Sequence, residues 1–166
     1  PMLNSLALEW LETLDMVKHF DNKVIVTASG AAGMPQNSGK RVENIAQLME
    51  SVQSAKIPLG DVYIDGLVFP ISVAPQYGTD YLDAVREIRT TYGTELHITG
   101  GLRNVSFGLP NRKLINDTFI YLGLDAGIDS GIIDPIQSDI RRVFDLDVMS
   151  ESVKLAREML EGRDEY

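Results

Sequence analysis

Thr99-Gly100-Gly101-Leu102-Arg103-Asn104-Val105-Ser106-Phe107-Gly108-Leu109-Pro110-Asn111-Arg112 is the most informative stretch of the sequence. A short apolar segment at residues 96–98 precedes it, and a helical pattern begins near Lys113. The loop between them is rich in glycine and carries two Asn, two Arg and one Ser. Loops held between rigid elements are where binding and catalytic residues concentrate. We therefore interpret this stretch as part of a strand–loop–helix unit with a functional loop.

The same unit recurs along the chain about five times. An apolar run at residues 1–5 is followed by predicted strands at residues 23–27, 62–64, 96–99 and 130–133. Apolar residues at helical spacing predict helices near residues 11–20, 42–52, 82–92, 115–126, 136–144 and 150–160. Strands and helices that alternate in this way indicate an α/β protein with a parallel sheet and right-handed crossovers.

Polar residues follow the predicted strands and discriminate between two α/β architectures. They are Asn4, Thr27, Asp65, Asn104 just beyond Thr99, and Asp134. In a (β/α)8 TIM barrel all strand ends meet at one mouth, where active sites are built. An open doubly wound sheet would bring together only those near its switch point. The pattern therefore favours the TIM-barrel type.

The length of the chain predicts an incomplete barrel. A complete TIM barrel takes about 250 residues, whereas these 166 residues hold about five β/α units. We expect residues 1–166 to form a single domain. Because an incomplete barrel exposes two strand edges, we also expect either a fragment of a longer protein or an association that covers the edges, most simply a homodimer.

Composition excludes several classes of site and partner. The absence of Cys excludes disulfides and thiolate chemistry, and two distant His make a zinc-type metal site improbable, so no metal is expected. A net charge of −9 argues against a nucleic-acid partner. No apolar run approaches membrane-spanning length and no signal-peptide pattern opens the sequence, so we expect a cytoplasmic protein without a membrane partner.

Specific motifs resemble one family. Gly101-Leu102-Arg103-Asn104-Val105-Ser106, followed by Asn111-Arg112-Lys113-Leu114-Ile115-Asn116, resembles the strand-seven loop of the methyltetrahydrofolate:corrinoid methyltransferases, which are pterin-binding barrels. Further motifs keep the family's order: Met2-Leu3-Asn4-Ser5 (strand four), Gly33-Met34-Pro35 with Arg41 (strand-five loop), Asp61-Val62-Tyr63-Ile64-Asp65 with Leu67 and Pro70 (strand six), and Ala126-Gly127 with Ile132-Ile133-Asp134 (the approach to strand eight).

The resemblance covers essentially the whole chain and implies both an activity and its reactants. It corresponds to strands four to eight of the barrel, so the first three β/α units have no counterpart here. The family moves the N5 methyl group of methyltetrahydrofolate to the cobalt of a corrinoid (cobalamin-type) cofactor that a partner protein carries. The chain is therefore expected to be a methyltransferase of one-carbon metabolism.

The resemblance assigns the main roles to Asn104, Asp65 and Asn4. Asn104 would be the catalytic residue, since its amide can support the charge change at N5 as the methyl group leaves. Asp65 would accept hydrogen bonds from the N–H donors of the pterin ring, and Asn4 would be a further pterin contact. An Asx turn at Asn104, a turn-capping role for Asp65 and a backbone contact at Asn4 explain the same positions without a ligand.

Three further loop residues take secondary assignments from the resemblance. Arg112 would approach the substrate beside the pterin, although a solvated loop Arg explains it equally well by position. Arg103 would either face solvent or pair with the glutamate tail of the substrate. Ser106 would support the loop backbone. By contrast, Asp134 before Pro135 is explained by a helix N-cap, and His97 by a satisfied core position.

Two other functions remain open. A dihydropteroate synthase-like enzyme shares the pterin barrel, but its late strands carry a Ser-Arg-Lys signature where this sequence reads Arg103-Asn104-Val105-Ser106. A non-catalytic partial barrel that binds pterin or a protein partner is the alternative of another class, and the missing units favour it.

Overall fold

The computed structural model describes residues 1–20, 22–31, 33–134 and 139–163. Four strands form one parallel sheet: β1 (Met2–Leu6), β2 (Lys23–Thr27), β3 (Val62–Asp65) and β4 (His97–Thr99). They follow the order β1-β2-β3-β4, so each strand pairs with its neighbour in sequence. A doubly wound sheet reverses its strand order at a switch point. The described sheet has no such reversal, which makes it compatible with part of a barrel and confirms the α/β class.

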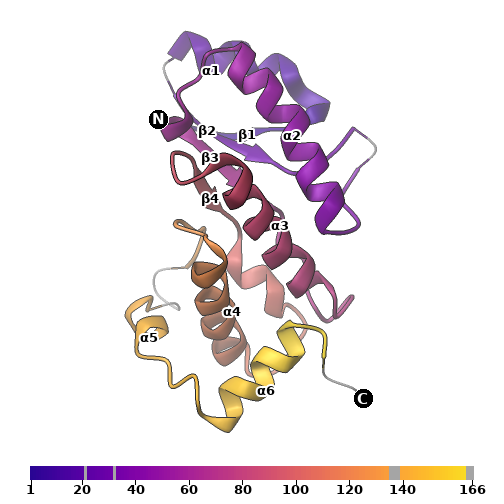
Figure 1. Ribbon diagram of the computed structural model, residues 1–166, viewed down its shortest axis with the longest axis vertical. Helices are drawn as coiled ribbons and strands as arrows, with labels where there is room; N and C mark the ends of the chain where they lie inside the picture. Colours follow the sequence, from indigo (N-terminus) through magenta and orange to yellow (C-terminus); the bar gives the residue numbers. More distant parts are fainter. Residues whose placement is uncertain (21, 32, 135–138, 164–166) are drawn as a thin grey trace.

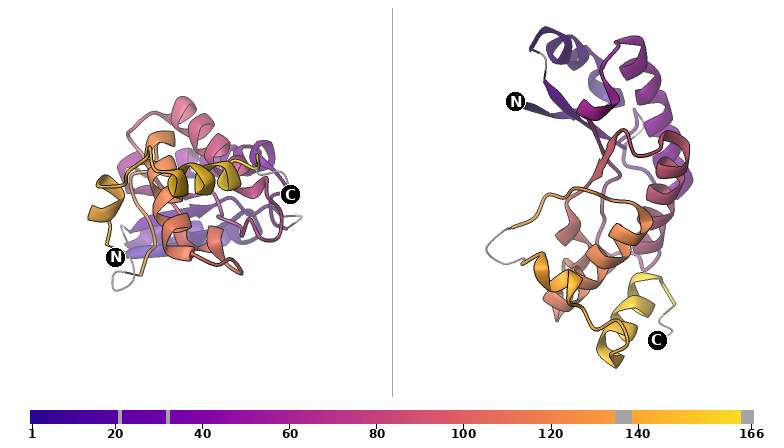
Figure 2. Two further views of the ribbon diagram at one scale, coloured as in Figure 1. Left: turned by 90° about the horizontal axis from the view of Figure 1, so that it is seen from below. Right: turned by 60° about the vertical axis from the view of Figure 1, so that its left-hand side comes forward.

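The helices extend the chain into an elongated arc (Figures 1 and 2). They are α1 (Leu14–Phe20), α2 (Ser38–Ser54), α3 (Tyr77–Tyr92), α4 (Arg112–Ala126), α5 (Arg141–Phe144) and α6 (Glu151–Leu160), with short 3-10 helices η1 (Leu8–Thr13), η2 (Leu59–Asp61) and η3 (Leu102–Ser106). Helices α2 and α3 lie along one side of the sheet (Figure 1). Helices α4, α5 and α6 gather at the end of the molecule that is opposite to α1. Within the described residues, no helix combines the length and apolarity needed to cross a lipid bilayer.

The two faces of the sheet differ in burial. On one face Val26, Ile64 and Ile98 pair in register and are fully buried in the core that α2 and α3 complete. On the opposite face Tyr63 and His97 are only partly buried, and their rings stack with centroids 4.4 Å apart. A barrel interior is normally filled by side chains from all its strands. This half-exposed face is therefore the one that would turn inward if the barrel were closed.

The strand predicted at residues 130–133 is wrong, although this segment runs beside β4. The Asp129 and Ser130 amides both donate to the Ile98 carbonyl at 3.3 and 3.2 Å, and the Ile132 amide donates to the Gly100 carbonyl at 2.9 Å. The Ile98 amide, however, donates to the Asp129 carboxylate at 3.0 Å. A side chain thus replaces a backbone acceptor, so the regular ladder of a strand does not form.

The helix expected after Asp134 is much shorter than its apolar pattern indicates. Residues 135–138, which include the expected first helical residue Pro135, lie outside the described residues. Helix α5 covers only Arg141–Phe144. Of its expected apolar stripe, Val143 is buried, whereas Phe144 is 73% exposed. The helix predicted at residues 11–20 is also shorter than expected, because the chain forms the 3-10 helix η1 first and becomes α-helical only at Leu14.

Helix α5 is joined to α4 by a partly buried ion pair. Asp117 is buried on α4 and accepts a hydrogen bond from the Arg142 guanidinium of α5. We expect Arg142→Met to lower the free energy of unfolding by about 2 kcal/mol, because it leaves a buried carboxylate without its partner. Denaturant unfolding followed by circular dichroism would measure this change.

Arg141 provides a matched control for that experiment. Its guanidinium pairs with Asp139 two residues away and is 85% exposed. Surface pairs of this kind contribute about 0–1 kcal/mol, so Arg141→Met should change stability little. Equal losses in the two variants would show that the Asp117–Arg142 pair has no special role in docking α5.

Candidate functional site

The carboxyl ends of β3 and β4 bring together a carboxylate and an amide around two glycines. A Cβ atom on Gly100 would lie 3.5 Å from Asp65 Oδ1 and 3.0 Å from Tyr81 Oη, and one on Gly101 would lie 2.8 Å from Asn104 Nδ2. Glycine at these positions lets the backbone pass close to Tyr81 Oη and Asn104 Nδ2, because a Cβ atom would crowd both of these atoms. Asp65 lies at ordinary contact distance from Gly100, and Asn104 lies beside Gly101, so both predicted site residues border this dipeptide.

Asp65 is the strongest electrostatic feature of this site. Burial raises the pKa of its carboxyl group, and a hydrogen bond from the Leu67 amide, which donates to Oδ1 at 2.8 Å, opposes that shift. The neighbouring Tyr81 is fully buried and its hydroxyl donates to the Thr99 carbonyl at 3.1 Å. Burial, with a smaller effect from Asp65, raises the pKa of Tyr81. The Tyr81 hydroxyl is therefore a neutral donor that fixes the end of β4 beside the carboxylate.

Asn104 lies on η3, where its side chain is partly exposed. Its backbone is fixed, since its amide donates to the Gly101 carbonyl at 2.9 Å and its carbonyl accepts from the Phe107 amide at 3.1 Å. Within the described part of the chain, the Asn104 side chain has no hydrogen-bond partner. The Asx turn considered from the sequence is thus not formed by this side chain, and its amide remains available to a ligand.

Arg112 is held against the loop that carries Asn104. Its Nε donates to Ser106 Oγ at 3.0 Å and its Nη2 donates to the Arg103 carbonyl at 3.2 Å. The guanidinium also lies 4.6 Å from the centre of the Phe107 ring. Ser106 is fully buried, and the loop-supporting role predicted for it remains a prediction. These contacts assign Arg112 a structural role in the loop; its predicted contact with substrate remains a prediction.

Arg103 pairs with a protein carboxylate, whereas the sequence suggested solvent or the glutamate tail of the substrate. Its Nη1 lies 3.4 Å from Asp134 Oδ2, and both side chains are partly exposed. Asp134, which was predicted to cap a helix, faces Arg103, and residues 135–138, which it would cap, lie outside the described part of the chain. The pair therefore connects η3 to the segment that runs beside β4 and whose Ile132 amide donates to the Gly100 carbonyl.

Asn4 does not lie in the same row as Asp65. Strand β1 continues to Leu6, so Asn4 is in its middle and not at its end as expected. Asn4 pairs with Ile25, and that row continues through Tyr63, whereas Thr27, Asp65 and Thr99 form the row two residues further on. The register shifts between Asn4 and Leu6. Asn4 therefore shares a face of the sheet with Asp65 but is separated from it by one strand and one row.

The loops after β3 and β4 are bonded to each other. The Ile71 amide donates to the Val105 carbonyl at 3.0 Å, and Ser72 Oγ donates to the Phe107 carbonyl at 2.6 Å. The loop that follows Asp65 and the loop that carries Asn104 are thus fixed relative to one another. Nothing in the local sequence of residues 71 and 72 indicates these long-range contacts.

Two polar residues lie in the buried face of α2, of which sequence reasoning named Arg41 only as part of a motif and missed Asn44. Arg41 Nε donates to the Gly66 carbonyl at 2.9 Å, and Asn44 Nδ2 donates to the Ala28 carbonyl at 2.8 Å. They hold the first residues beyond β3 and β2, respectively. A signal was present, because Arg41 occupies the position that starts the buried series continued by Ile45, Leu48 and Val52. A charged residue in such a series is rarely there for packing alone.

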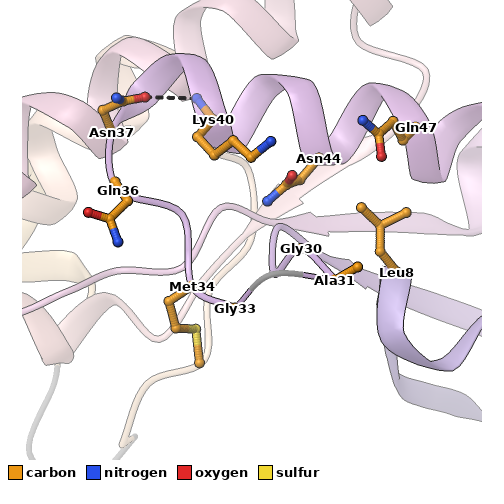
Figure 3. A pocket seen from close by; sticks show the side chains of 10 residues that line it. All are labelled: Leu8, Gly30, Ala31, Gly33, Met34, Gln36, Asn37, Lys40, Asn44 and Gln47. Carbon is orange, nitrogen blue, oxygen red and sulfur yellow. Dashed lines mark hydrogen bonds between the residues drawn. The ribbon is translucent and has the colours of Figure 1, made fainter.

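A cavity of about 460 Å³ lies beside this region, between α2 and the loop that follows β2 (Figure 3). Lys40, Asn44 and Gln47 of α2 line one side, and Met34 and Gln36 of the loop line another. The remaining lining residues are Leu8, Gly30, Ala31, Gly33 and Asn37. None of the predicted site residues is among those that line this cavity.

The chemistry available at Asp65 and Asn104 is hydrogen bonding and charge stabilisation. The described residues contain no group of three His, Cys, Asp or Glu side chains that could hold a metal ion. A half-buried carboxylate with one oxygen already bonded can accept from a planar donor edge, and a free amide can both donate and accept. The site therefore suits recognition of a polar heterocycle and support of a charge change on it.

Comparison with known proteins confirms the resemblance to folate- and corrinoid-dependent methyltransferases. The chain is 32% identical over 127 residues to the methylcorrinoid:tetrahydrofolate methyltransferase of Eubacterium limosum, an alignment that covers 76% of this chain and 46% of that protein. It is 28% identical over 131 residues to the methionine synthase of Mycobacterium leprae (75% of this chain, 11% of that protein). It is 26% identical over 129 residues to the methionine synthase of Mycobacterium tuberculosis (74% and 11%).

The matched relatives are longer than this chain. The chain spans about half the length of the first of them and about a tenth of the two methionine synthases. No family model matches the sequence.

Proposed function

We propose that this chain, a sequence relative of methyltransferases that act with tetrahydrofolate and corrinoids, forms one wall of a pterin site in a TIM-type barrel and transfers the N5 methyl group of methyltetrahydrofolate to the cobalt of a corrinoid protein. The observation that carries the proposal is the placement of the Asp65 carboxylate beside Gly100 and of the Asn104 amide beside Gly101. The Asp65 carboxylate can accept hydrogen bonds from the ring edge of a pterin, and the Asn104 amide can bond to its reacting nitrogen.

Asp65 is proposed to orient the pterin. The ring presents adjacent N–H donors on its 2-aminopyrimidinone edge, and a carboxylate accepts such donors in a paired, charge-assisted way. Its Oδ1 already accepts from the Leu67 amide, and Oδ2 has no described protein partner. The partial burial of Asp65 strengthens any hydrogen bond that it makes to a ligand, since the local dielectric constant is lower than in water.

Asn104 is proposed to act at N5. When the methyl group leaves for its acceptor, the electron pair of the C–N bond returns to N5, which gains negative charge as the bond breaks and takes a proton from solvent to give tetrahydrofolate. A hydrogen bond from the Asn104 amide that strengthens during this change stabilises the transition state more than the bound substrate. The free side chain of Asn104 and its fixed backbone are consistent with this role.

The other predicted contacts complete the proposal. Asn4 would touch the pterin from β1, on the face of the sheet that it shares with Asp65. Arg112 and Ser106 would hold the loop of Asn104 in place, with Arg112 beside the substrate. Arg103 and its partner Asp134 would lie at the edge of the site. The corrinoid, carried by a partner protein, would supply the nucleophilic cobalt that takes the methyl group.

The name of one relative raises the question of direction. The protein from Eubacterium limosum is named for transfer from a methylcorrinoid to tetrahydrofolate. A site that stabilises the transition state of one direction stabilises the same transition state in the other. The proposed roles of Asp65 and Asn104 therefore hold whichever direction the pathway uses.

We also propose that other structure covers the open side of the sheet. The face of Tyr63 and His97 is only partly buried, and within the described residues β1 has a neighbour on one side alone. The E. limosum relative is about twice as long as the matched region. Three further β/α units, or a second copy of this chain, would close the barrel and face the wall that Asp65 and Asn104 form.

Two measurements on the protein test this function. We expect methyltetrahydrofolate to bind in isothermal titration calorimetry, and the methyl group to pass to free reduced cobalamin, followed by the absorbance of the corrinoid. Binding without transfer would favour a non-catalytic pterin-binding module. If neither were observed, while the protein folded cooperatively, an interaction module would replace the proposal.

A further inference from the structure

We infer that Arg41 is a positioning residue that orients the Asp65 carboxylate through the peptide group between Gly66 and Leu67. The inference rests on the proposed function, since it concerns how Asp65 is presented to the pterin. Arg41 lies in the first turn of α2, and Asp65 lies at the end of β3, so the two residues are joined only in the folded protein. No direct contact between their side chains is required.

Arg41 is buried against the loop that follows β3. The residue is 0% exposed, its Nε donates to the Gly66 carbonyl at 2.9 Å and its Nη2 donates to the Leu67 carbonyl at 3.3 Å. The guanidinium also lies 4.9 Å from the centre of the Phe69 ring. Burial lowers the pKa of Arg41, and the nearby Asp80 carboxylate opposes that shift. A buried charge is expensive, so an apolar residue would serve better here if packing alone were needed.

The link to Asp65 passes through a single peptide group. The carbonyl of Gly66 and the amide of Leu67 belong to the same planar unit and point in opposite directions. Arg41 holds the carbonyl end, and the amide end donates to Asp65 Oδ1 at 2.8 Å. Fixing the carbonyl therefore fixes the direction of the N–H, and hydrogen bonds aligned through a peptide group polarise one another.

The conformation of Leu67 explains why the turn needs to be held. Its φ is 62°, in the left-handed region that a leucine side chain disfavours. Without external contacts this peptide would relax toward an ordinary turn, and the N–H would leave the carboxylate. Arg41, which binds the carbonyls on both sides of Leu67, opposes that relaxation. The Asp65 carboxylate then stays in one orientation, in which Oδ2 and the second lone pair of Oδ1 remain available to the two donors of the ligand.

Arg89 offers a matched control, because it makes similar contacts away from Asp65. Its Nε and Nη2 donate to the Gly127 carbonyl at 3.0 and 2.6 Å, and its Nη1 donates to the Leu96 carbonyl at 2.9 Å. Leu96 precedes β4, at the end of the sheet opposite to Asp65. Removing the Arg89 guanidinium therefore costs these carbonyl hydrogen bonds and an ion pair with Asp129, without altering the turn at Leu67.

The test is a double-mutant cycle on methyltetrahydrofolate affinity. We expect Arg41→Met to weaken binding about tenfold when Asp65 is present and by less than twofold in the Asp65→Asn background, because the loss passes through the carboxylate. Arg41→Lys keeps the charge but not the planar guanidinium, so its affinity should lie between those of the wild type and Arg41→Met. If Arg41→Met does not fold, Arg41→Lys takes its place in the cycle. Arg89→Met should leave binding within twofold. Additive losses for Arg41 and Asp65 would overturn the inference.

A second measurement needs no folate and separates this inference from the proposed function. In Arg41→Met or Arg41→Lys, the Leu67 amide proton should exchange with solvent at least about tenfold faster relative to the core amides of β3, and Arg89→Met should not change this ratio. If wild-type protein failed to bind methyltetrahydrofolate, the proposed function would fail while the exchange result still decided whether Arg41 holds the turn. Unchanged exchange in both Arg41 variants would overturn the inference.

Discussion

Replacing Asn104 by alanine is expected to lower the rate of methyl transfer by roughly 10²–10³-fold, the usual loss when one preorganised donor is removed from a developing charge. Binding of methyltetrahydrofolate should weaken by less than about tenfold, because the hydrogen bond to N5 is proposed to be weak in the bound substrate and strong only as the C–N bond breaks. Stopped-flow measurement of transfer to reduced cobalamin, together with calorimetry, gives the two numbers.

The control for Asn104 lies in the same loop. Asn111 precedes α4 with a φ of 52°, and its side chain caps no helix amide. Asn111→Gly keeps this left-handed conformation accessible and should leave the transfer rate unchanged. Equal losses of rate and affinity in Asn104→Ala would assign Asn104 to binding alone and would remove its catalytic role.

Replacing Asp65 by asparagine is expected to weaken methyltetrahydrofolate binding by roughly 30- to 150-fold, which corresponds to about 2–3 kcal/mol for lost charge-assisted hydrogen bonds. The asparagine has the same shape but presents only one acceptor atom, so it cannot take two ring donors. Asp61 provides the control, because it precedes β3 at the other end and pairs with Lys23 at the surface. Asp61→Asn should bind as the wild type does.

The pH dependence of binding tests the charge on Asp65 separately. Because burial raises the pKa of Asp65 above the ordinary value of 3.8, binding by the wild type should decline as the pH falls through that raised pKa. The carboxyl group is protonated below it and loses its charge-assisted bonds. Asp65→Asn should lack this component, and the difference between the two profiles removes any titration of the folate. Identical profiles would contradict a pterin contact by Asp65.

Local sequence predicted the central part of the fold well. The strand at residues 23–27 matches β2, the helix ending at Ala126 is closed by Gly127 with a φ of 118°, and Asp65 ends β3 beside Gly100 of the loop that carries Asn104. These features depend on short-range causes: β-branched runs, a glycine C-cap and the common direction of parallel strands. Such causes can be evaluated within a window of a few residues.

The features that the sequence did not predict depend on contacts between distant residues. Asn4 was placed at the end of its strand because polar residues follow the apolar run, but the shifted pairing of β1 with β2 carries the strand on to Leu6. The segment at residues 130–133 has the composition of a strand, yet the Asp129 side chain replaces a backbone partner beside it. Arg41 was noticed only as part of a motif, since the carbonyls that it binds are 25 and 26 residues away.

Hydrogen bonds from Ile71 to Val105 and from Ser72 to Phe107 join the two loops of this site. Together with the contacts of Arg112, they make the segments after β3 and β4 one unit, so replacing only one of the two loops would break it. A chimera that imports the β4 loop of a relative without its β3 loop should misplace Asn104 relative to Asp65, whereas a graft of both should transfer specificity intact. Insertions in one segment should therefore be inherited with compensating changes in the other.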